Sequence, residues 1–186
     1  MELLFDEGRL VTTIAYALRH GPSRFALELD DEGWTKFDDL IAAIRFERYE
    51  WTDLNAPTAK AALESMDRFE FRGDYIRAAY GHSVELLTPP PIAAPPAILF
   101  HGTAADNVAS IFQQGVRKMK RRFVHLSADL DWVIRFLSDK PTRTILAVNT
   151  SMAINAGVSF RRANNHVWLT DSVPPTLLAI HSQGVG

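Results

Sequence analysis

The chain is divided by the segment TPPPIAAPP at residues 88–96, which holds five of its ten prolines. Proline restricts the backbone and favours an extended conformation, so a run this dense is typical of a semi-rigid linker. We therefore expect a lobe at residues 1–88, a linker at residues 89–96 and a second lobe at residues 97–186. A chain of 186 residues is long enough for two small domains.

The two sides of this segment differ in charge. Residues 1–88 hold 10 basic and 17 acidic side chains, a net charge of −7, whereas residues 97–186 hold 10 basic and 5 acidic ones, a net charge of +5. This asymmetry supports two lobes and indicates that an anionic ligand is attracted mainly to the second.

The first lobe has the pattern of short helices followed by a hairpin. Apolar residues at Leu10, Ile14 and Leu18 predict one face of a helix that ends at Gly21. Two further helices are expected before a hairpin that turns at residues 72–74. Three helices closed by a hairpin indicate a winged-helix-like module, but its acidic surface disfavours direct binding of duplex DNA.

The second lobe combines strand-like pieces with helices, which indicates a strand-rich α+β lobe. Residue Gly115 is expected to end its first helix. The expected strands lie at residues 97–100, 123–126, 144–148, 166–169 and 177–181.

The densest charge in the chain is the run RKMKRR at residues 117–122. Basic residues this close repel one another, so the run needs either water or an anionic ligand. No glutamate follows Glu85, so the second lobe has no glutamate to act as a general base. A phosphate monoester, with a second pKa of about 6, is already anionic at pH 7 and needs no such base. The composition therefore indicates phosphate recognition.

Several classes of protein and of site are disfavoured. The chain has no cysteine, and its six histidines include no HxxxH pair, so we expect neither thiolate chemistry nor a metal site. The GxGxxG and GxxxxGK[ST] motifs are absent, which argues against Rossmann and P-loop nucleotide sites. No apolar run is long enough to span a membrane, and the start MELLFDE lacks the basic flank of a signal peptide. We expect a cytoplasmic protein.

A set of short motifs follows one another through most of the chain. They are LRHGP at 18–22, LELD at 27–30 with GW at 33–34, IRAAYGHS at 76–83, FHGT at 100–103, KMKR at 118–121 with VHLS at 124–127, and VWLT at 167–170. This ordered set resembles the RNA 2′-phosphotransferase (tRNA 2′-phosphotransferase) family. The resemblance implies a winged-helix-like first lobe and an ADP-ribosyltransferase-like second lobe.

The resemblance also implies a transferase reaction on RNA. The enzyme would use NAD⁺, consumed as a co-substrate, to remove an internal RNA 2′-phosphate of the kind left by tRNA splicing. An ADP-ribosylated RNA would form first, with release of nicotinamide. Its breakdown would give RNA with a free 2′-hydroxyl and ADP-ribose 1″,2″-cyclic phosphate. We expect the protein to act as a monomer, without a metal.

The family's functional residues can be placed in this sequence. The catalytic set implied by the resemblance is Arg19, His20, Arg77 and Arg121. The implied NAD⁺ contacts are His101, Gly102, Thr103, His125 and Ser127. Arg19 and His20 would hold the RNA phosphate, and Arg77 and Arg121 would act mainly in the second step. Each also has an ordinary structural interpretation; Arg19 and His20, for example, suit the end of a helix.

The sequence departs from the family pattern at four positions, one of which is Ala26, where the family commonly has glycine. Phe123 stands where the family usually has a second histidine, Ala163 where it often has serine, and His166 where it has glycine. In the basic run, the register favours Arg121 over Arg122. We expect these changes to affect NAD⁺ affinity or substrate preference more than the class of reaction.

Other functions remain open at this point. The same machinery could ADP-ribosylate a terminal phosphate on RNA or DNA and stop after the first step. A non-catalytic winged-helix regulator would instead bind duplex with a steep salt dependence and leave NAD⁺ intact. A protein-modifying ADP-ribosyltransferase is disfavoured by the missing glutamate.

Overall fold

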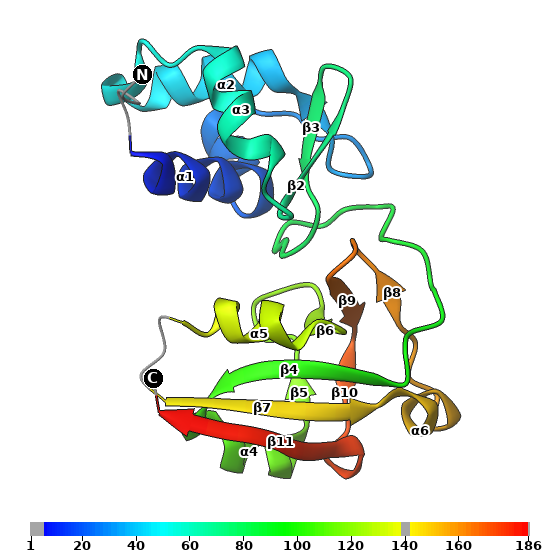
Figure 1. Ribbon diagram of the computed structural model, residues 1–186. Coiled ribbons are helices and arrows are strands. Elements are labelled where there is room, and N and C mark those ends of the chain that lie inside the picture. Colours follow the sequence, from blue (N-terminus) through cyan, green and yellow to red (C-terminus); the bar gives the residue numbers. More distant parts are fainter. Residues whose placement is uncertain (1–5, 139–141, 186) are drawn as a thin grey trace. The chain divides into compact units, whose positions relative to one another are not determined.

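The computed structural model describes residues 6–138 and 142–185 and forms two compact units, which divide between Pro89 and Pro90 (Figure 1). Each unit has its own hydrophobic core. Helices combine with antiparallel sheets in both units, which confirms the expectation of a mixed helix and strand protein. Among the described residues, no helix is long and apolar enough to cross a membrane.

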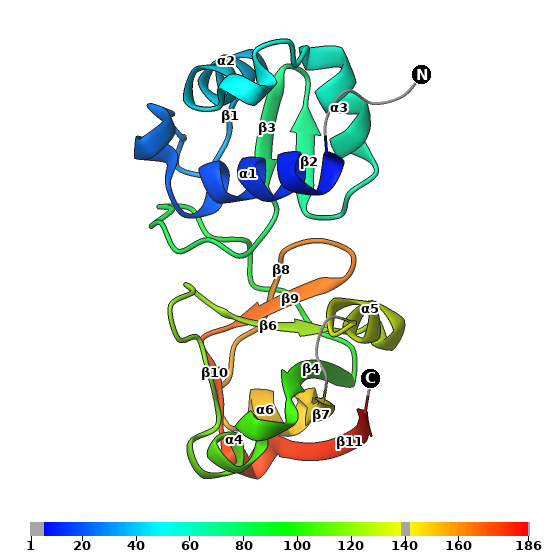
Figure 2. The ribbon, with the colours of Figure 1, turned by 90° about the vertical axis from the view of Figure 1, so that its left-hand side faces the viewer.

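The first unit packs helices against a small antiparallel sheet with strand order β1–β3–β2. Figure 2 shows α1 crossing the β2–β3 hairpin. Its elements, with η for 3-10 helices, are α1 (Glu7–Arg19), η1 (Pro22–Phe25), β1 (Thr35–Lys36), α2 (Phe37–Glu47), η2 (Tyr49–Trp51), α3 (Ala56–Glu64), β2 (Phe69–Arg72) and β3 (Tyr75–Ala78).

The predicted first helix and the predicted hairpin are both confirmed. The Asp6 side chain accepts the Arg9 N–H at 3.1 Å and caps α1, and the apolar residues spaced four apart lie fully buried in the core. In the hairpin, Gly73 adopts a φ of 60° at the turn, a torsion that glycine accepts at little steric cost. This turn pairs Glu70 with Arg77 across the two strands.

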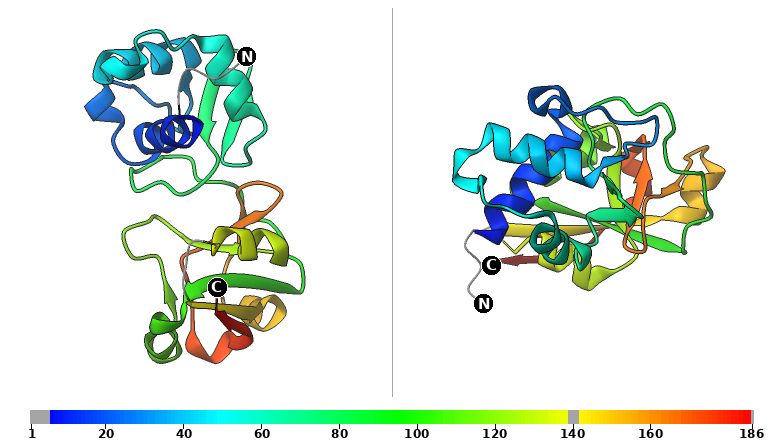
Figure 3. Two further views of the ribbon diagram at one scale, coloured as in Figure 1. Left: turned by 60° about the vertical axis from the view of Figure 1, so that its left-hand side comes forward. Right: turned by 90° about the horizontal axis from the view of Figure 1, so that it is seen from above.

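The second unit is built on a six-stranded antiparallel sheet with strand order β11–β7–β4–β6–β9–β8, beside the separate pair β5–β10. In Figure 3, α5 lies over β4. Its elements are β4 (Ile98–Ala104), η3 (Ala105–Asn107), α4 (Val108–Gln114), β5 (Val116–Arg117), β6 (Val124–Ser127), α5 (Leu130–Phe136), β7 (Thr142–Asn149), α6 (Thr150–Asn155), β8 (Arg161–Arg162), β9 (Val167–Thr170), β10 (Ser172–Val173), η4 (Pro175–Leu177) and β11 (Leu178–Val185).

Each strand expected in the second unit overlaps an observed one, but β4 extends well beyond its expected end. The strand was expected to end at Phe100, whereas β4 pairs with β7 as far as Ala104. His101, Gly102 and Thr103 are therefore strand residues. Gly102 explains how α5 can pack there, because a Cβ at this position would lie 2.8 Å from Val133 Cγ1 and from Leu137 Cδ1.

The proline-rich segment does not behave as a free linker after Pro90. The Pro90 carbonyl accepts a hydrogen bond from Arg161 Nη1 at 2.8 Å, and the Pro96 carbonyl accepts one from Thr150 Oγ1 at 2.6 Å. Between them, the Ala93 N–H donates to the Phe160 carbonyl at 2.9 Å. Proline lacks an N–H but keeps its carbonyl as an acceptor. Because these three hydrogen bonds all reach residues of the second unit, residues 90–96 are bound to that unit.

Candidate active site

His20 lies at the C-terminal end of α1, where it caps the helix by donating its N–H to the Tyr16 carbonyl. Its Nδ1 lies 2.9 Å from Ser83 Oγ, and the Arg19 carbonyl accepts the Ser83 N–H at 3.0 Å. These bonds join the segment after β3 to the end of the helix. The structure thus brings the LRHGP and IRAAYGHS motifs together.

The Arg19 side chain points along the same segment. Its guanidinium lies over the Tyr80 ring, 5.0 Å from the ring centroid, and its Nη2 is 3.4 Å from the Arg68 carbonyl. That carbonyl also accepts the Ala79 N–H at 3.0 Å. Arg19 therefore reaches the end of the β2–β3 ladder that carries Arg77.

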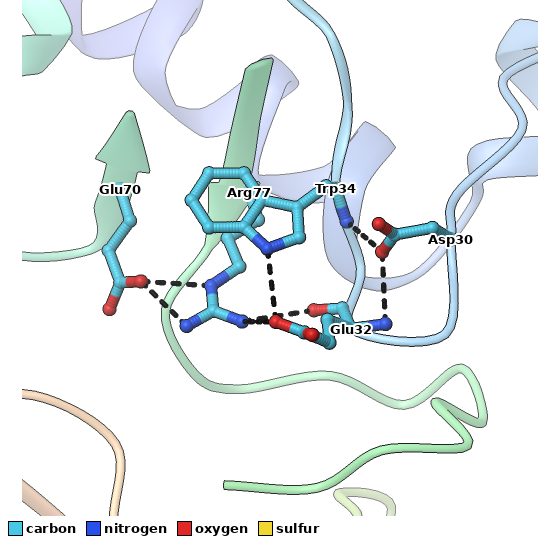
Figure 4. Close-up of polar contacts among 5 residues, drawn as sticks. All are labelled: Asp30, Glu32, Trp34, Glu70 and Arg77. Atoms are coloured by element: carbon cyan, nitrogen blue, oxygen red, sulfur yellow. Dashed lines mark hydrogen bonds and ion pairs between the residues drawn. The ribbon is translucent and has the colours of Figure 1, made fainter. Parts of the chain in front are cut away.

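Arg77 is held by two carboxylates, as Figure 4 shows. Its Nε and Nη2 lie 2.9 and 2.7 Å from Glu70 Oε2, and its Nη1 lies 3.3 Å from Glu32 Oε2. The guanidinium also lies over the Trp34 ring, 4.6 Å from the centroid. Cation–π contact and charge-assisted hydrogen bonds together restrict the position of this side chain.

The turn before β1 supports this cluster. Asp30 Oδ1 accepts the N–H groups of Glu32 and Trp34 at 2.9 and 2.8 Å. The indole N–H of Trp34 in turn lies 3.3 Å from the Glu32 oxygen that faces Arg77. The GW motif thus lies beside Arg77, because one turn holds both the indole and the carboxylate in place.

In the second unit, His101 is a half-buried residue of β4 whose ring contacts the neighbouring strand β6. Its Nδ1 lies 3.0 Å from the His125 carbonyl and must donate to it, since a carbonyl has no proton to give. Burial is the main reason that the pKa of His101 lies below its ordinary value; the bond to His125 opposes this, and the charge of Arg121 adds to it. The ring is therefore neutral, with Nε2 as an acceptor.

Arg121 lies on an exposed turn, near His101 and His125. Its N–H donates to the Lys118 carbonyl at 2.9 Å, and its Nη1 is 3.5 Å from His125 Nδ1. Arg122 instead lies over the Phe123 ring, 5.6 Å from the centroid. The structure therefore separates the two candidate arginines and puts Arg121 beside the predicted histidines.

Thr103 and Ser127 are buried and bonded within the unit. Thr103 Oγ1 accepts from Asn107 Nδ2 at 3.2 Å. Ser127 Oγ accepts the Asp129 N–H at 3.0 Å and has an exposed fraction of 0%. In this arrangement both hydroxyls stabilise turns beside the sheet.

His166, one of the departures from the family pattern, contacts a carboxylate on the second unit. Its Nδ1 lies 3.0 Å from Asp129 Oδ2, while Asp129 Oδ1 accepts the Trp132 N–H at 3.0 Å and caps α5. The bond from Trp132, with the bond from His166, lowers the pKa of Asp129 below its ordinary value. Among the described residues, no group of His, Asp and Glu could hold a metal ion.

Sequence comparison places these residues among known proteins. A family model described as RNA 2′-phosphotransferase, Tpt1/KptA family, matches residues 6–172, a span that contains all nine predicted site residues. A protein from Acetivibrio thermocellus named probable RNA 2′-phosphotransferase is 35% identical over 175 residues, which cover 92% of this chain and 96% of that protein. A protein with the same name from Rhizobium rhizogenes is 40% identical, and the match covers 89% of this chain and 89% of that protein. Another from Streptomyces griseus is 35% identical, and the match covers 94% of this chain and 98% of that protein.

Proposed function

Since the chain belongs to the RNA 2′-phosphotransferase family, we propose that it removes an internal 2′-phosphate from RNA in a reaction that consumes NAD⁺. The observation that carries this proposal is the family match at residues 6–172, which spans both units and every predicted site residue. The transferase class follows from the family; the co-substrate and the roles of single residues belong to the proposal.

The folds of the two units agree with this assignment. In the first, helices α1 to α3 pack with a sheet that ends in the β2–β3 hairpin, and we assign this unit as the winged-helix-like lobe. In the second, an antiparallel sheet carries the FHGT motif on its β4 strand, beside β6 and β7. We assign this unit as the ADP-ribosyltransferase-like lobe.

In the first step, a 2′-phosphate oxygen forms a bond to the ribose carbon that bears nicotinamide, and the bond to nicotinamide breaks. Arg19 and His20 bind the phosphate and orient this oxygen. A helix C-terminus favours cations and disfavours anions, so the two side chains, not the helix end, attract the phosphate. Positioning is the main requirement, because the nucleophile is already anionic at neutral pH.

In the second step, the neighbouring 2″-hydroxyl attacks phosphorus and the bond from phosphorus to the RNA 2′-oxygen breaks. The hydroxyl loses its proton, and the RNA oxygen gains one. Negative charge builds on the non-bridging oxygens, where Arg77 and Arg121 stabilise it. A preorganised donor of this kind contributes roughly 3–4 kcal/mol to the transition state.

The chemistry of the second unit fits a dinucleotide co-substrate. His101 Nε2 is an acceptor on a neutral ring, and it suits the hydroxyl of a ribose or the amide of nicotinamide. Arg121 and the neighbouring basic run suit phosphate oxygens. Gly102, Thr103, His125 and Ser127 complete the proposed NAD⁺ region, with Thr103 and Ser127 holding its turns.

The test is to incubate the purified protein with NAD⁺ and a short RNA that carries one internal 2′-phosphate. RNA mass and gel mobility report the fate of the phosphate, and chromatography reports the nucleotide products. The matched controls are the same RNA without the phosphate and with only a terminal phosphate. We expect RNA with a free 2′-hydroxyl, nicotinamide and ADP-ribose cyclic phosphate from the first substrate alone.

Two other results would contradict the proposal in different ways. If ADP-ribose accumulates on a terminal phosphate and no cyclic phosphate forms, the protein caps nucleic-acid ends. If NAD⁺ stays intact and the protein binds duplex with a steep salt dependence, it is a non-catalytic regulator.

A further inference from the structure

We propose that Glu70 is a positioning residue for the reaction: it fixes the orientation in which Arg77 meets the phosphate. This inference rests on the proposed function, which gives Arg77 its role in the second step. The structure contributes the positioning argument, because it shows which groups hold Arg77.

The β2–β3 hairpin places Glu70 directly beside Arg77. The two residues face each other across the β2–β3 ladder, so their side chains leave neighbouring strands on the same face of the sheet. Glu70 Oε2 accepts a hydrogen bond from Arg77 Nε at 2.9 Å and lies 2.7 Å from Arg77 Nη2. These two contacts fix one whole edge of the guanidinium. The pair is also partly buried, with exposed fractions of 25% for the Arg77 side chain and 31% for that of Glu70.

Glu32 makes a weaker contact with the same guanidinium. It lies on a turn, its side chain is 46% exposed, and its Oε2 is 3.3 Å from Nη1 while being shared with the Trp34 indole. Longer and more exposed ion pairs contribute less. The orientation of Arg77 therefore depends more on Glu70 than on Glu32.

The arrangement leaves Arg77 with N–H donors for a phosphate. A guanidinium has five N–H donors, and Nη2 carries a second N–H besides the one directed at Glu70. Phosphate can therefore bind at the outer end of Arg77 while Glu70 keeps the Nε edge. The two carboxylates that contact Arg77 also offset its charge, which weakens its attraction of an anion in the ground state. Arg77 is thus suited to a step in which charge on the phosphate increases.

The test uses Glu70→Gln in the full-length protein, with RNA carrying an internal 2′-phosphate and NAD⁺. Single-turnover kinetics give the rate of formation of ADP-ribosylated RNA and the rate of its breakdown. Loss of a charge-assisted hydrogen bond predicts a second step slowed by about 10-fold to 100-fold. We expect the first step and the KM for RNA to change by less than about twofold, so the intermediate accumulates.

A double-mutant cycle distinguishes positioning from a general structural role. If Glu70 acts through Arg77, then Glu70→Gln adds no further loss in an Arg77→Ala background. Glu50→Gln is the matched control: it removes the carboxylate that pairs with Arg9 at 3.2 Å in the same unit and should leave both steps unchanged. Glu70→Asp keeps the charge but shortens the side chain, and it should slow the second step less than Glu70→Gln does.

A second step at the wild-type rate in Glu70→Gln, or in Glu70→Asp if the first variant does not fold, would overturn the inference. So would a loss of the same size in the Arg77→Ala background. Both outcomes require an active wild-type enzyme, so they leave the proposed function standing. Failure of the wild-type protein to dephosphorylate the RNA would overturn the proposed function, and this inference with it.

Discussion

Arg77 and Arg121 are proposed to stabilise the same phosphate, but the two units hold them in opposite ways. Arg77 lies between two carboxylates and over an indole ring, in a lobe with a net charge of −7. Arg121 lies on an exposed turn within a basic run, and its side chain faces His125 at 3.5 Å. Among the described residues, no ion pair involves Arg121.

This difference indicates a division of labour. A guanidinium that carboxylates already fix loses little freedom when the reaction begins, but attracts anions weakly. A guanidinium without a carboxylate keeps its full charge, but must be ordered by its ligand. We therefore expect geometry to dominate at Arg77 and charge at Arg121.

The largest effect is expected from Arg121→Ala. Removal of a donor that stabilises developing charge in the transition state costs about 10²–10³ in rate, so the second step should slow by that factor and ADP-ribosylated RNA should accumulate in a single-turnover assay. Arg117→Ala is the control, because Arg117 lies in the same basic run but bonds to Gln114 at 3.2 Å. An equal loss in both variants would show that the run acts only through its total charge.

Gly102→Ala tests whether the second unit depends on close packing under its proposed ligand site. The added methyl group would meet Val133 and Leu137 at 2.8 Å, and overpacking of this kind typically costs about 1–3 kcal/mol. Thermal unfolding should shift to a lower temperature. The control is Gly8→Ala in the exposed first turn of α1, where the nearest atom is Asp6 Oδ1 at 3.3 Å. An unfolding temperature unchanged in Gly102→Ala would contradict the packing of α5 on β4.

Lysine substitutions test whether the planar shape of the guanidinium or only its positive charge is needed at Arg77 and at Arg121. Arg77→Lys keeps the charge but loses the planar edge that Glu70 fixes, whereas Arg121→Lys keeps most of what an exposed cation provides. We expect the second step to be slower in Arg77→Lys than in Arg121→Lys by about tenfold. The rate of breakdown of isolated ADP-ribosylated RNA measures this. The reverse order would contradict the division of labour.

The smallest effect concerns pH. Because the pKa of His101 is lowered in the folded state, the unfolded chain binds a proton first as the pH falls below the ordinary value of about 6.5. The contribution of His101 to stability is complete above that value and is lost as the pH falls toward the folded-state pKa. The free energy of unfolding should fall with a slope of at most about 1.4 kcal/mol per pH unit. Denaturant titrations between pH 7.5 and 5.5 should show a shallower slope in His101→Asn than in the wild type.

Regular periodicity made the first unit predictable from sequence. The four-residue spacing from Leu10 to Leu18 defines one helical face, and the turn at Gly73 sets the register of the hairpin. The extent of β4 was not predicted, because a glycine weakens the interior of a strand and so makes its end hard to place from sequence. Gly102 is tolerated there because α5 packs against it, a contact between segments that no local pattern reveals.

The site shows the same limit. Resemblance to the family suggested which side chains act, and the structure shows Ser83 beside His20 and the Arg121 guanidinium 3.5 Å from His125 Nδ1. The partners of Arg77 were missed, because acidic residues of the first lobe were considered only as net charge. Glu70 could have been found from the hairpin register, whereas Glu32 required the turn that Asp30 holds.

The binding of residues 90–96 to the second unit bears on how the chain could be recombined. An exchange point at residue 97 would remove the carbonyls that Arg161 and Thr150 use, at Pro90 and Pro96. An exchange point between Pro89 and Pro90 removes neither. A gene rearrangement that transfers the second unit to another protein must therefore include Pro90 and Pro96. The transferable domain begins at residue 90, before β4.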